Sequence, residues 1–461
     1  MRVPNPFSPT QIFVKRSFKL VWALAALAST VTFLGNAELC LAEPPPAPRD
    51  VIVVTLDTTR IDRLSVYGAP RVTSPILEKL ARGGVVYDRA YSTSSWTLPS
   101  HVSMFTGRMP RAHGAHNDAA GTANLSQQVE NQDLGELRVN ALGPAQVTLA
   151  EVLADNGYAT GAFVGGPWLA PRFGALQGFQ TVDANIVNFG GRPANQVTDR
   201  ALAWTATLTK DQPMFLFLNY FDAHWPYTPP IGLRALVRGE TAESSWDAYD
   251  GEIRFADIQL GLLLKGLAKI GRADSAVVIV VGDHGHLFDE HGVTGHADWL
   301  WEELIRVPLV VRDPGAANAG ERSSELVSVM DLPAIVSKAV GIPLPPTFHS
   351  TLPGNRKEIL TEVYRQKLSV RLKGSALDRD LLAILRPPWK MILDSRGGAE
   401  LYDVYADSGE TKDRADEFVA TVSGLREALD TWRERTPRPE PKTAVVDPST
   451  REWLRELGYV E

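Results

Sequence analysis

Five short, almost unbroken apolar runs constrain the fold of this chain more than any other feature. The runs are VIVVTL (51–56), ATGAFVG (159–165), MFLFLNYF (214–221), AVVIVVG (276–282) and VPLVV (307–311). Strands with one face in water alternate apolar and polar residues, so continuous runs are typical of strands buried on both faces. Stretches with helical spacing lie between them, near residues 74–82, 98–106, 147–156, 196–209 and 247–270. This alternation predicts an α/β fold with a large, mostly parallel sheet flanked by helices.

The pattern changes after about residue 350. Four shorter apolar segments follow, with breaks at Pro387–Pro388 and Gly397–Gly398, and a charged stretch with helical spacing covers roughly 414–435. Proline and glycine pairs at such breaks are typical of turns between neighbouring strands. We therefore predict a main domain over residues 50–349 and a smaller C-terminal α+β subdomain of antiparallel strands and a helix over residues 350–461.

The first 42 residues have the pattern of a targeting segment. Three basic residues between positions 15 and 19 precede an apolar run from Leu20 to Leu34, and small residues follow. This order is typical of a cleaved signal peptide, and an uncleaved N-terminal anchor is the alternative, although the run is short for a membrane span of about 20 residues. A proline-rich linker occupies residues 43–49. The protein is therefore expected to be exported to the periplasm or cell envelope, or secreted.

Charge and cysteine content limit the partners. The chain has a formal net charge of −7, and residues 1–42 carry four positive charges and one negative, so their removal changes the charge by −3, to −10. A negative surface is repelled by phosphate backbones, so nucleic acid is not expected as a partner, and a membrane only through an uncleaved N-terminal segment. The single cysteine is Cys40. A chain cut after residue 42 has no thiol and no disulfide.

Residues with metal-binding chemistry stand where predicted strands end. Asp57 directly follows the first apolar run, and Asp283 and His284 follow the run that ends at Gly282. Ligand sites in open α/β sheets lie outside the carboxyl ends of strands, where an unpaired buried carboxylate would be costly. A divalent metal ion held by these residues would remove that cost. Helix capping by Asp57 and a turn at Asp283–Gly285 are the alternative roles.

Histidines and a threonine occur in similar places. Eight of the nine histidines fall in three short stretches, and those of most interest are His101, His224 and His296. Thr97 precedes Leu98–Pro99 at the start of a predicted helix, where a hydroxyl residue commonly caps the helix. The positive end of the helix dipole also favours an oxyanion, and a neighbouring metal ion would make the hydroxyl a nucleophile.

Together, these segments resemble the sulfatase branch of the alkaline phosphatase superfamily. The family's opening strand and acidic ligand match VIVVTLDTTRIDRLSVYG, and its nucleophile motif matches TLPSH and TGRMPRAHG. Its histidine strand matches FLFLNYFDAHWPYTPP, and its second metal segment matches VVGDHGHLFDEHGVTGHADWLWEELIRVPLVV. Four motifs in the family's order, with similar C-terminal segments, extend the resemblance over essentially residues 50–461. It implies a catalytic domain over residues 50–349 that hydrolyses esters and holds a divalent metal.

Three departures from the family pattern change the expected chemistry. Sulfatases convert a cysteine or serine to formylglycine, and Thr97 stands at that position, followed by His101 where the family has arginine. Thr58 stands where a second aspartate is common. Phosphodiesterase, phosphatase and phosphonate-hydrolase relatives use threonine or serine directly, so the resemblance implies Thr97 as a direct nucleophile.

The implied metal ligands are Asp57, Asp283, His284 and the Thr97 oxygen. An imidazole among the ligands favours zinc or manganese over calcium. One metal site is expected, and Asp222 with His224 and His296 is a weaker candidate for a second.

The resemblance also gives the remaining residues roles. Thr97 attacks sulfur or phosphorus, His224 and His296 donate hydrogen bonds or a proton, and His101 either orients Thr97 or packs in the core. We predict an exported, metal-dependent hydrolase of sulfate, phosphate or phosphonate esters carried by a small molecule, glycan or lipid. A cell-envelope transferase that moves a phospho-alcohol group through the same Thr97 intermediate, and an inactive sulfatase-like binding protein, are the alternatives. The sequence does not specify the substrate or the oligomeric state.

Overall fold

The computed structural model describes residues 49–118, 121, 123–124, 138–186, 190–233 and 245–439. The predicted targeting segment over residues 1–42 and residues 43–48 of the linker lie outside this part of the chain. Arg49–Glu461 is one compact unit. A search of the described residues finds no helix with the length and apolar character that a membrane span requires.

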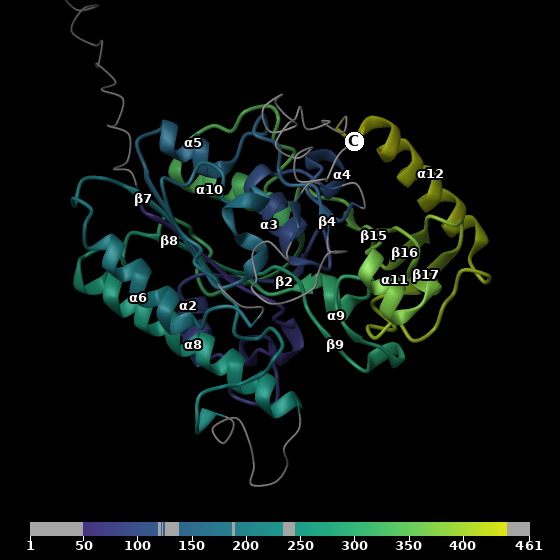
Figure 1. The fold of residues 1–461 in the computed structure, drawn as a ribbon, viewed down its shortest axis with the longest axis horizontal. Coiled ribbons are helices and arrows are strands. Elements are labelled where there is room, and N and C mark those ends of the chain that lie inside the picture. Colours follow the sequence, from purple (N-terminus) through teal and green to yellow (C-terminus); the bar gives the residue numbers. More distant parts are fainter. Residues whose placement is uncertain are drawn as a thin grey trace, which may run out of the picture. The chain divides into compact units, whose positions relative to one another are not determined.

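A nine-stranded sheet lies at the centre of this unit (Figure 1). Its strands follow the order β11 (Arg306–Val307), β2 (Val85–Tyr91), β12 (Leu309–Arg312), β8 (Val277–Gly282), β1 (Val51–Leu56), β7 (Met214–Tyr220), β5 (Ala159–Val164) and β6 (Thr181–Asp183), and β13 (Arg322–Ser328) also pairs with β2. The run from β8 to β6 is parallel throughout, whereas β12 is antiparallel to both of its neighbours. The predicted mostly parallel sheet is therefore confirmed, and each of the five apolar runs overlaps at least one of its strands.

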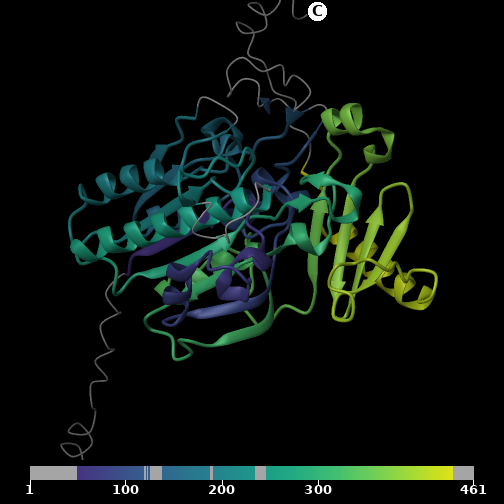
Figure 2. The same cartoon turned by 90° about the horizontal axis from the view of Figure 1, so that it is seen from below.

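Successive residues of the central strands face two different helical layers. Val51 and Val53 belong to a core shared with α3 (Thr97–Thr106), α5 (Leu149–Asp155) and α10 (Leu332–Val340). Ile52 and Val54 belong to a second core with α2 (Pro75–Ala81), α6 (Ala194–Thr205) and α8 (Ser245–Lys269). Figures 1 and 2 show α6 and α8 as long helices along one face of the sheet. Both faces are covered, which explains why these strands are apolar at nearly every position.

A four-stranded antiparallel sheet follows, as predicted. Its strands are β14 (Ile359–Val363), β15 (Leu381–Arg386), β16 (Trp389–Asp394) and β17 (Ala399–Asp403), paired in chain order. Pro387–Pro388 forms the β15–β16 turn. The predicted charged helix is α12 (Val419–Arg435), and its Leu425 and Leu429 pack on this sheet. A short helix, α11 (Lys367–Lys373), lies in the connection between β14 and β15.

A buried lysine joins this smaller sheet to the segment before β11. Lys390 on β16 is fully buried, and its Nζ lies 2.9 Å from Glu410 Oε1 and 3.3 Å from Glu302 Oε1. Glu302 begins the short helix α9 (Glu302–Ile305), and its backbone N–H donates to Glu410. Burial lowers the pKa of Lys390, but Glu410 and Glu302 outweigh that effect and raise it.

We expect Lys390→Met to destabilise the protein by about 3–5 kcal/mol, because removal of one partner leaves buried carboxylates without a cation. Urea unfolding at pH 7 measures the free energy of unfolding. Lys412→Met is the matched control, because Lys412 pairs with Glu417 on the surface with 66% of its side chain exposed, and it should change stability by less than about 0.5 kcal/mol. Equal effects of the two substitutions would contradict a structural role for the buried group.

Candidate active site

The carboxyl ends of three neighbouring strands coincide. In the register of the sheet, Leu56 at the end of β1 lies opposite Tyr220 of β7 on one side and Gly282 of β8 on the other. The next residues along β1 and β8 are Asp57 and Asp283, and both are fully buried. Parallel pairing therefore brings together two acids that are 226 positions apart in the sequence.

Asp57, Asp283 and His284 form a group that could hold a metal ion. One ligand atom from each lies within 4.8 Å of the others, and this is the one such group among the residues that the structure describes. Asp57 Oδ1 and Asp283 Oδ2 are buried without a hydrogen-bond partner. Burial, and then repulsion by Asp283, raises the pKa of Asp57, and burial raises the pKa of Asp283 to about 8. Two buried carboxylates with unpartnered oxygens fit a divalent cation, because the ion would supply the missing positive charge.

The backbone fixes the tautomer of His284. His284 Nδ1 lies 2.9 Å from the carbonyl oxygen of Gly285, which can only accept, so Nδ1 carries the proton. Burial lowers the pKa of His284 to about 4, so the ring is neutral and the lone pair of Nε2 can accept a hydrogen bond or bind a metal ion. This arrangement is typical of metal-binding histidines.

Thr97 lies at the first position of α3, and its hydroxyl faces His284. Its Oγ1 lies 3.2 Å from His284 Nε2, and the side chain is 1% exposed. The residue that precedes the helix is Trp96, which makes no side-chain capping bond. The hydroxyl of Thr97 is therefore available to the group of acids instead of capping the helix.

Thr58 and Asn219 complete the surroundings of the two acids, and neither was assigned a role from the sequence. Asn219 Nδ2 donates to Asp57 Oδ2 at 3.2 Å, and the backbone N–H of Thr58 donates to Asp283 Oδ1 at 3.1 Å. Thr58 has a φ of 49°, which is unusual for a β-branched residue, and its hydroxyl is buried without a partner. Asn219 could have been noticed as the one amide in the apolar run over 214–221. The strained backbone of Thr58 left no signal in the sequence.

His101 is buried beneath Thr97. Its Nδ1 lies 2.9 Å from the carbonyl oxygen of Thr97, one turn earlier in α3, and its Nε2 lies 3.0 Å from the Thr55 hydroxyl. Burial lowers the pKa of His101 to about 3, so the ring is neutral. Both nitrogens are therefore occupied by contacts that hold the first turn of α3 against β1.

His224 and His296 face each other beside His284. Their Nε2 atoms lie 3.3 Å apart, and the rings of His284 and His296 have centroids 4.6 Å apart. His224 Nδ1 donates to the carbonyl of Trp225 at 2.7 Å, and burial lowers the pKa of His224 to about 4. Burial, His284 and His224 likewise lower the pKa of His296. The structure thus brings His224 and His296 together with His284, the histidine that the Thr97 hydroxyl contacts.

Asp222 points to a different place. Its two carboxylate oxygens lie 3.0 and 3.1 Å from the backbone nitrogen of Ala194, the first residue of α6. Burial raises its pKa to about 7. The Asp222 carboxylate thus accepts a hydrogen bond at the N-terminus of α6. Among the residues that the structure describes, it forms no metal-binding group with His224 and His296.

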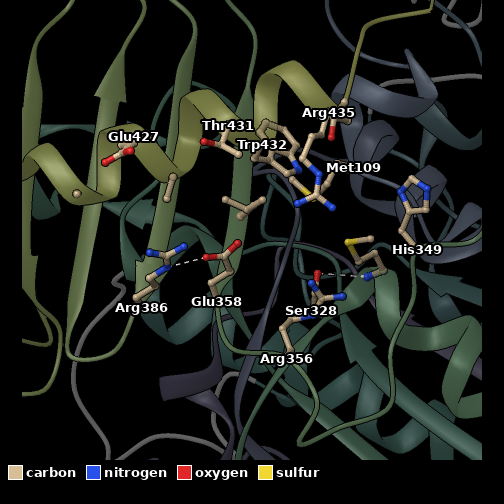
Figure 3. Close-up of a pocket in the computed structure, with 15 residues that line it drawn as sticks. Met109, Ser328, His349, Arg356, Glu358, Arg386, Glu427, Thr431, Trp432 and Arg435 are labelled. Carbon is tan, nitrogen blue, oxygen red and sulfur yellow. Dashed lines mark hydrogen bonds and ion pairs between the residues drawn. The ribbon is translucent and has the colours of Figure 1, made fainter.

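A separate groove of about 780 Å³ lies between α12 and the smaller sheet (Figure 3). Figure 3 shows Thr431, Trp432 and Arg435 along α12, opposite an ion pair in which Arg386 Nε donates to Glu358 at 2.7 Å. None of its lining residues belongs to the site around Thr97.

Comparison with known proteins identifies the class to which this geometry belongs. The family model described as sulfatase matches residues 49–342. An N-acetylgalactosamine-6-O-sulfatase of Bacteroides thetaiotaomicron is 21% identical over 84% of this chain and 93% of its own length. A steryl-sulfatase of Rattus norvegicus is 25% identical over 70% of this chain and 71% of its own length. The phosphonate monoester hydrolase of Agrobacterium radiobacter has a similar fold, with a TM-score of 0.64 and 18% identity over 84% of this chain and 96% of that one.

The chain belongs to the sulfatase family, and it is an ester-hydrolysing enzyme. The predicted family and reaction class are therefore confirmed. Members of this family depend on a metal ion, and Asp57, Asp283 and His284 form the group that could bind one here.

Proposed function

We propose that this protein is a hydrolase of sulfate, phosphate or phosphonate esters in which the Thr97 hydroxyl is the nucleophile. The observation that carries the proposal is the position of Thr97 Oγ1, 3.2 Å from His284 Nε2 and beside two carboxylates with unpartnered oxygens. Among the described residues, the one hydrogen-bond partner of this hydroxyl is therefore a ring of the group that could hold a metal ion. At the first position of a ten-residue helix it also lies in the positive end of the helix dipole.

Asp57, Asp283, His284 and the Thr97 oxygen are the proposed ligands of one divalent ion. Two carboxylates and an imidazole are a donor set that favours zinc or manganese over calcium. When bound, the ion would lower the pKa of the Thr97 hydroxyl and neutralise charge on a substrate oxygen.

The reaction proceeds by two displacements at sulfur or phosphorus. The Thr97 oxygen, having lost its proton to solvent, forms a bond to the central atom while the bond to the ester oxygen breaks. The departing oxygen takes a proton from the pair formed by His224 and His296. Water then gives one proton to this pair and adds to the same atom, the bond to Thr97 breaks, and the Thr97 oxygen takes back a proton from solvent. His101 holds the Thr97 carbonyl throughout and is assigned a positioning role.

Two arguments support the proposed substrate class, one from the relatives and one from the chemistry of Thr97. The matched relatives are named as sulfatases of N-acetylgalactosamine and of steryl groups, and a similarly folded protein is a phosphonate monoester hydrolase. A threonine nucleophile removes the need for formylglycine, which leaves phosphorus esters as chemically suitable as sulfate esters. We therefore propose small-molecule, glycan or lipid monoesters of either element.

The test is hydrolysis of a matched panel by the metal-loaded protein. An aryl sulfate, a phosphate monoester, a phosphodiester and a phosphonate monoester with the same leaving group are compared, each with and without an added alcohol. Turnover of at least one, abolished by chelation and restored by zinc or manganese, is the expected result. Products carrying the alcohol in place of water would identify a transferase, and no turnover of any ester would contradict the proposal.

We expect His296→Ala to lower kcat/KM about 10²–10³-fold for an ester with a poor alkyl leaving group, because a general acid contributes that much. The loss should be small for a nitrophenyl ester, whose leaving group departs without a proton. His349→Ala, which changes a histidine in the separate groove, is the matched control. Equal losses with both leaving groups would contradict the acid role of His296.

The proposed export rests on residues 1–42 alone. N-terminal sequencing of the protein from the cell envelope should find a mature chain that begins close to residue 43. An intact N-terminus in the membrane fraction would identify an uncleaved anchor instead.

A further inference from the structure

A lysine in the connection between β14 and β15 of the smaller sheet contacts the segment that contains His296. Lys373 is the last residue of α11, and its Nζ donates to Asp298 Oδ2 at 2.7 Å. The same nitrogen lies 5.0 Å from the ring centroid of Trp299 and 3.9 Å from where a Cβ on Gly295 would be. Lys373 therefore lies against the stretch from Gly295 to Trp299, which includes His296.

Besides this ion pair, the stretch has a few backbone hydrogen bonds to the fold, and its Ala297 and Trp299 side chains pack in two of the apolar cores. At its start, Thr294–Gly295 forms a two-residue strand, β10, that pairs with β9 (Leu287–Phe288). Beyond His296, the backbone N–H of Ala297 donates to the carbonyl of Ser95 at 3.0 Å, and Ala297 has a φ of 72°. A left-handed alanine is strained, so the surrounding contacts must hold it in place.

The two side chains of the ion pair differ sharply in exposure. The Asp298 side chain is 4% exposed, whereas that of Lys373 is 42% exposed. A carboxylate that is nearly buried needs its cation, so the ion pair constrains Asp298 more than Lys373. The positive charge of Lys373 also contributes, after burial and the neighbouring histidines, to lowering the pKa of His296.

We propose that Lys373 is a positioning residue for the ester hydrolysis proposed above, and that its ion pair with Asp298 holds the His296 segment in its working position. Because α11 lies in the connection between β14 and β15, the smaller sheet then contributes a residue that supports the active site. Lys373 acts through Asp298 and makes no contact with the reacting atoms. Its loss should change kcat and leave KM nearly unchanged.

The experiment compares wild type with Lys373→Met, Lys373→Arg, Asp298→Asn and the double variant Lys373→Met/Asp298→Asn. Lys373→Met should lower kcat about 10²-fold, because a displacement of about 1 Å in a catalytic group can cost that much. Lys373→Arg keeps the charge and should restore most of the rate. The double variant should be no slower than Lys373→Met alone, since both changes remove the same pair.

Hydrogen–deuterium exchange supplies a readout that does not depend on activity. In Lys373→Met, amides over residues 287–301 should exchange faster, the Ala297 amide above all, while strands β1, β7 and β8 keep the protection of wild type. Lys367→Met, at the exposed start of the same helix, is the matched control and should leave both kcat and exchange unchanged.

Exchange over 287–301 that stays at the wild-type level in Lys373→Met would overturn the inference, whatever the activity. Faster exchange throughout the protein would also overturn it, because it would show general destabilisation. If wild type hydrolyses no ester but the local change in exchange is seen, the proposed function fails and the role of the ion pair in holding this segment stands.

Discussion

Thr97→Ala should reduce kcat by at least about 10³-fold on every ester that the wild type hydrolyses, because loss of a covalent nucleophile commonly costs that much or more. The substitution removes the oxygen that lies 3.2 Å from His284 Nε2 and leaves the backbone of α3 unchanged. The helix should keep its stability, since the hydroxyl makes no capping bond. A rate assay and a thermal melt on the same preparation separate the two effects.

Two further variants sharpen this result. Thr97→Ser keeps the hydroxyl and should retain measurable turnover, whereas Thr106→Ala removes a buried hydroxyl at the other end of the same helix and should leave kcat unchanged. The Thr106 hydroxyl donates to the carbonyl of Val102 and belongs to the helix alone. Comparable losses in Thr97→Ala and Thr106→Ala would show that damage to α3, not loss of a nucleophile, explains the first.

The covalent intermediate can be sought directly. Rapid acid quenching during turnover, followed by digestion after arginine, should give a peptide over residues 90–108 that carries one sulfuryl or phosphoryl group. Thr97→Ala should yield no modified peptide. Modification at another residue of the same peptide would assign the nucleophile elsewhere.

The sequence pattern predicted the mostly parallel sheet, because its central strands are continuous apolar runs. It also placed Asp57, Asp283 and His284 directly after two of these strands, but the order of the strands was not predicted, so the resemblance to sulfatases was needed to group the three residues. Strands β2 and β13 were not predicted, because their segments VVYDRAY and RSSELVS mix polar and apolar residues.

The sequence pattern did not predict contacts between side chains and turns that lie far apart in the chain. Asp222 was a candidate for a second metal site because it stands two positions before His224, yet its carboxylate turns to the start of α6. Lys373 stands in a short charged segment 77 positions after His296, and nothing in its spacing indicated that it would reach Asp298. The Thr58 backbone has a positive φ, which is a property of the folded chain that its sequence does not indicate.

Asp283→Asn should abolish activity and yet stabilise the metal-free protein, by on the order of 4 kcal/mol at pH 7, since pH 7 is 3.2 units above the ordinary aspartate pKa of 3.8 and one unit corresponds to about 1.4 kcal/mol. Burial raises the pKa of Asp283 to about 8 from 3.8. The folded, metal-free protein therefore holds a proton that the unfolded chain releases near pH 4. This bound proton contributes fully to the stability of the fold below pH 4, and the contribution is lost as the pH rises towards 8. The uncharged variant has no such loss, so its free energy of unfolding should depend less on pH.

Urea unfolding of the chelated protein between pH 5 and 8 measures this difference, and added zinc or manganese reverses it. The free energy of unfolding of wild type should increase with the logarithm of the metal concentration. That of Asp283→Asn should increase little. Asp222→Asn is the matched control, because burial also raises the pKa of Asp222, to about 7, but its carboxylate serves the start of α6. It should show the same gain with metal as wild type. A metal-free Asp283→Asn variant less stable than wild type at pH 7 would contradict burial as the cause, because a carboxylate buried to hold a cation is costly when the cation is absent.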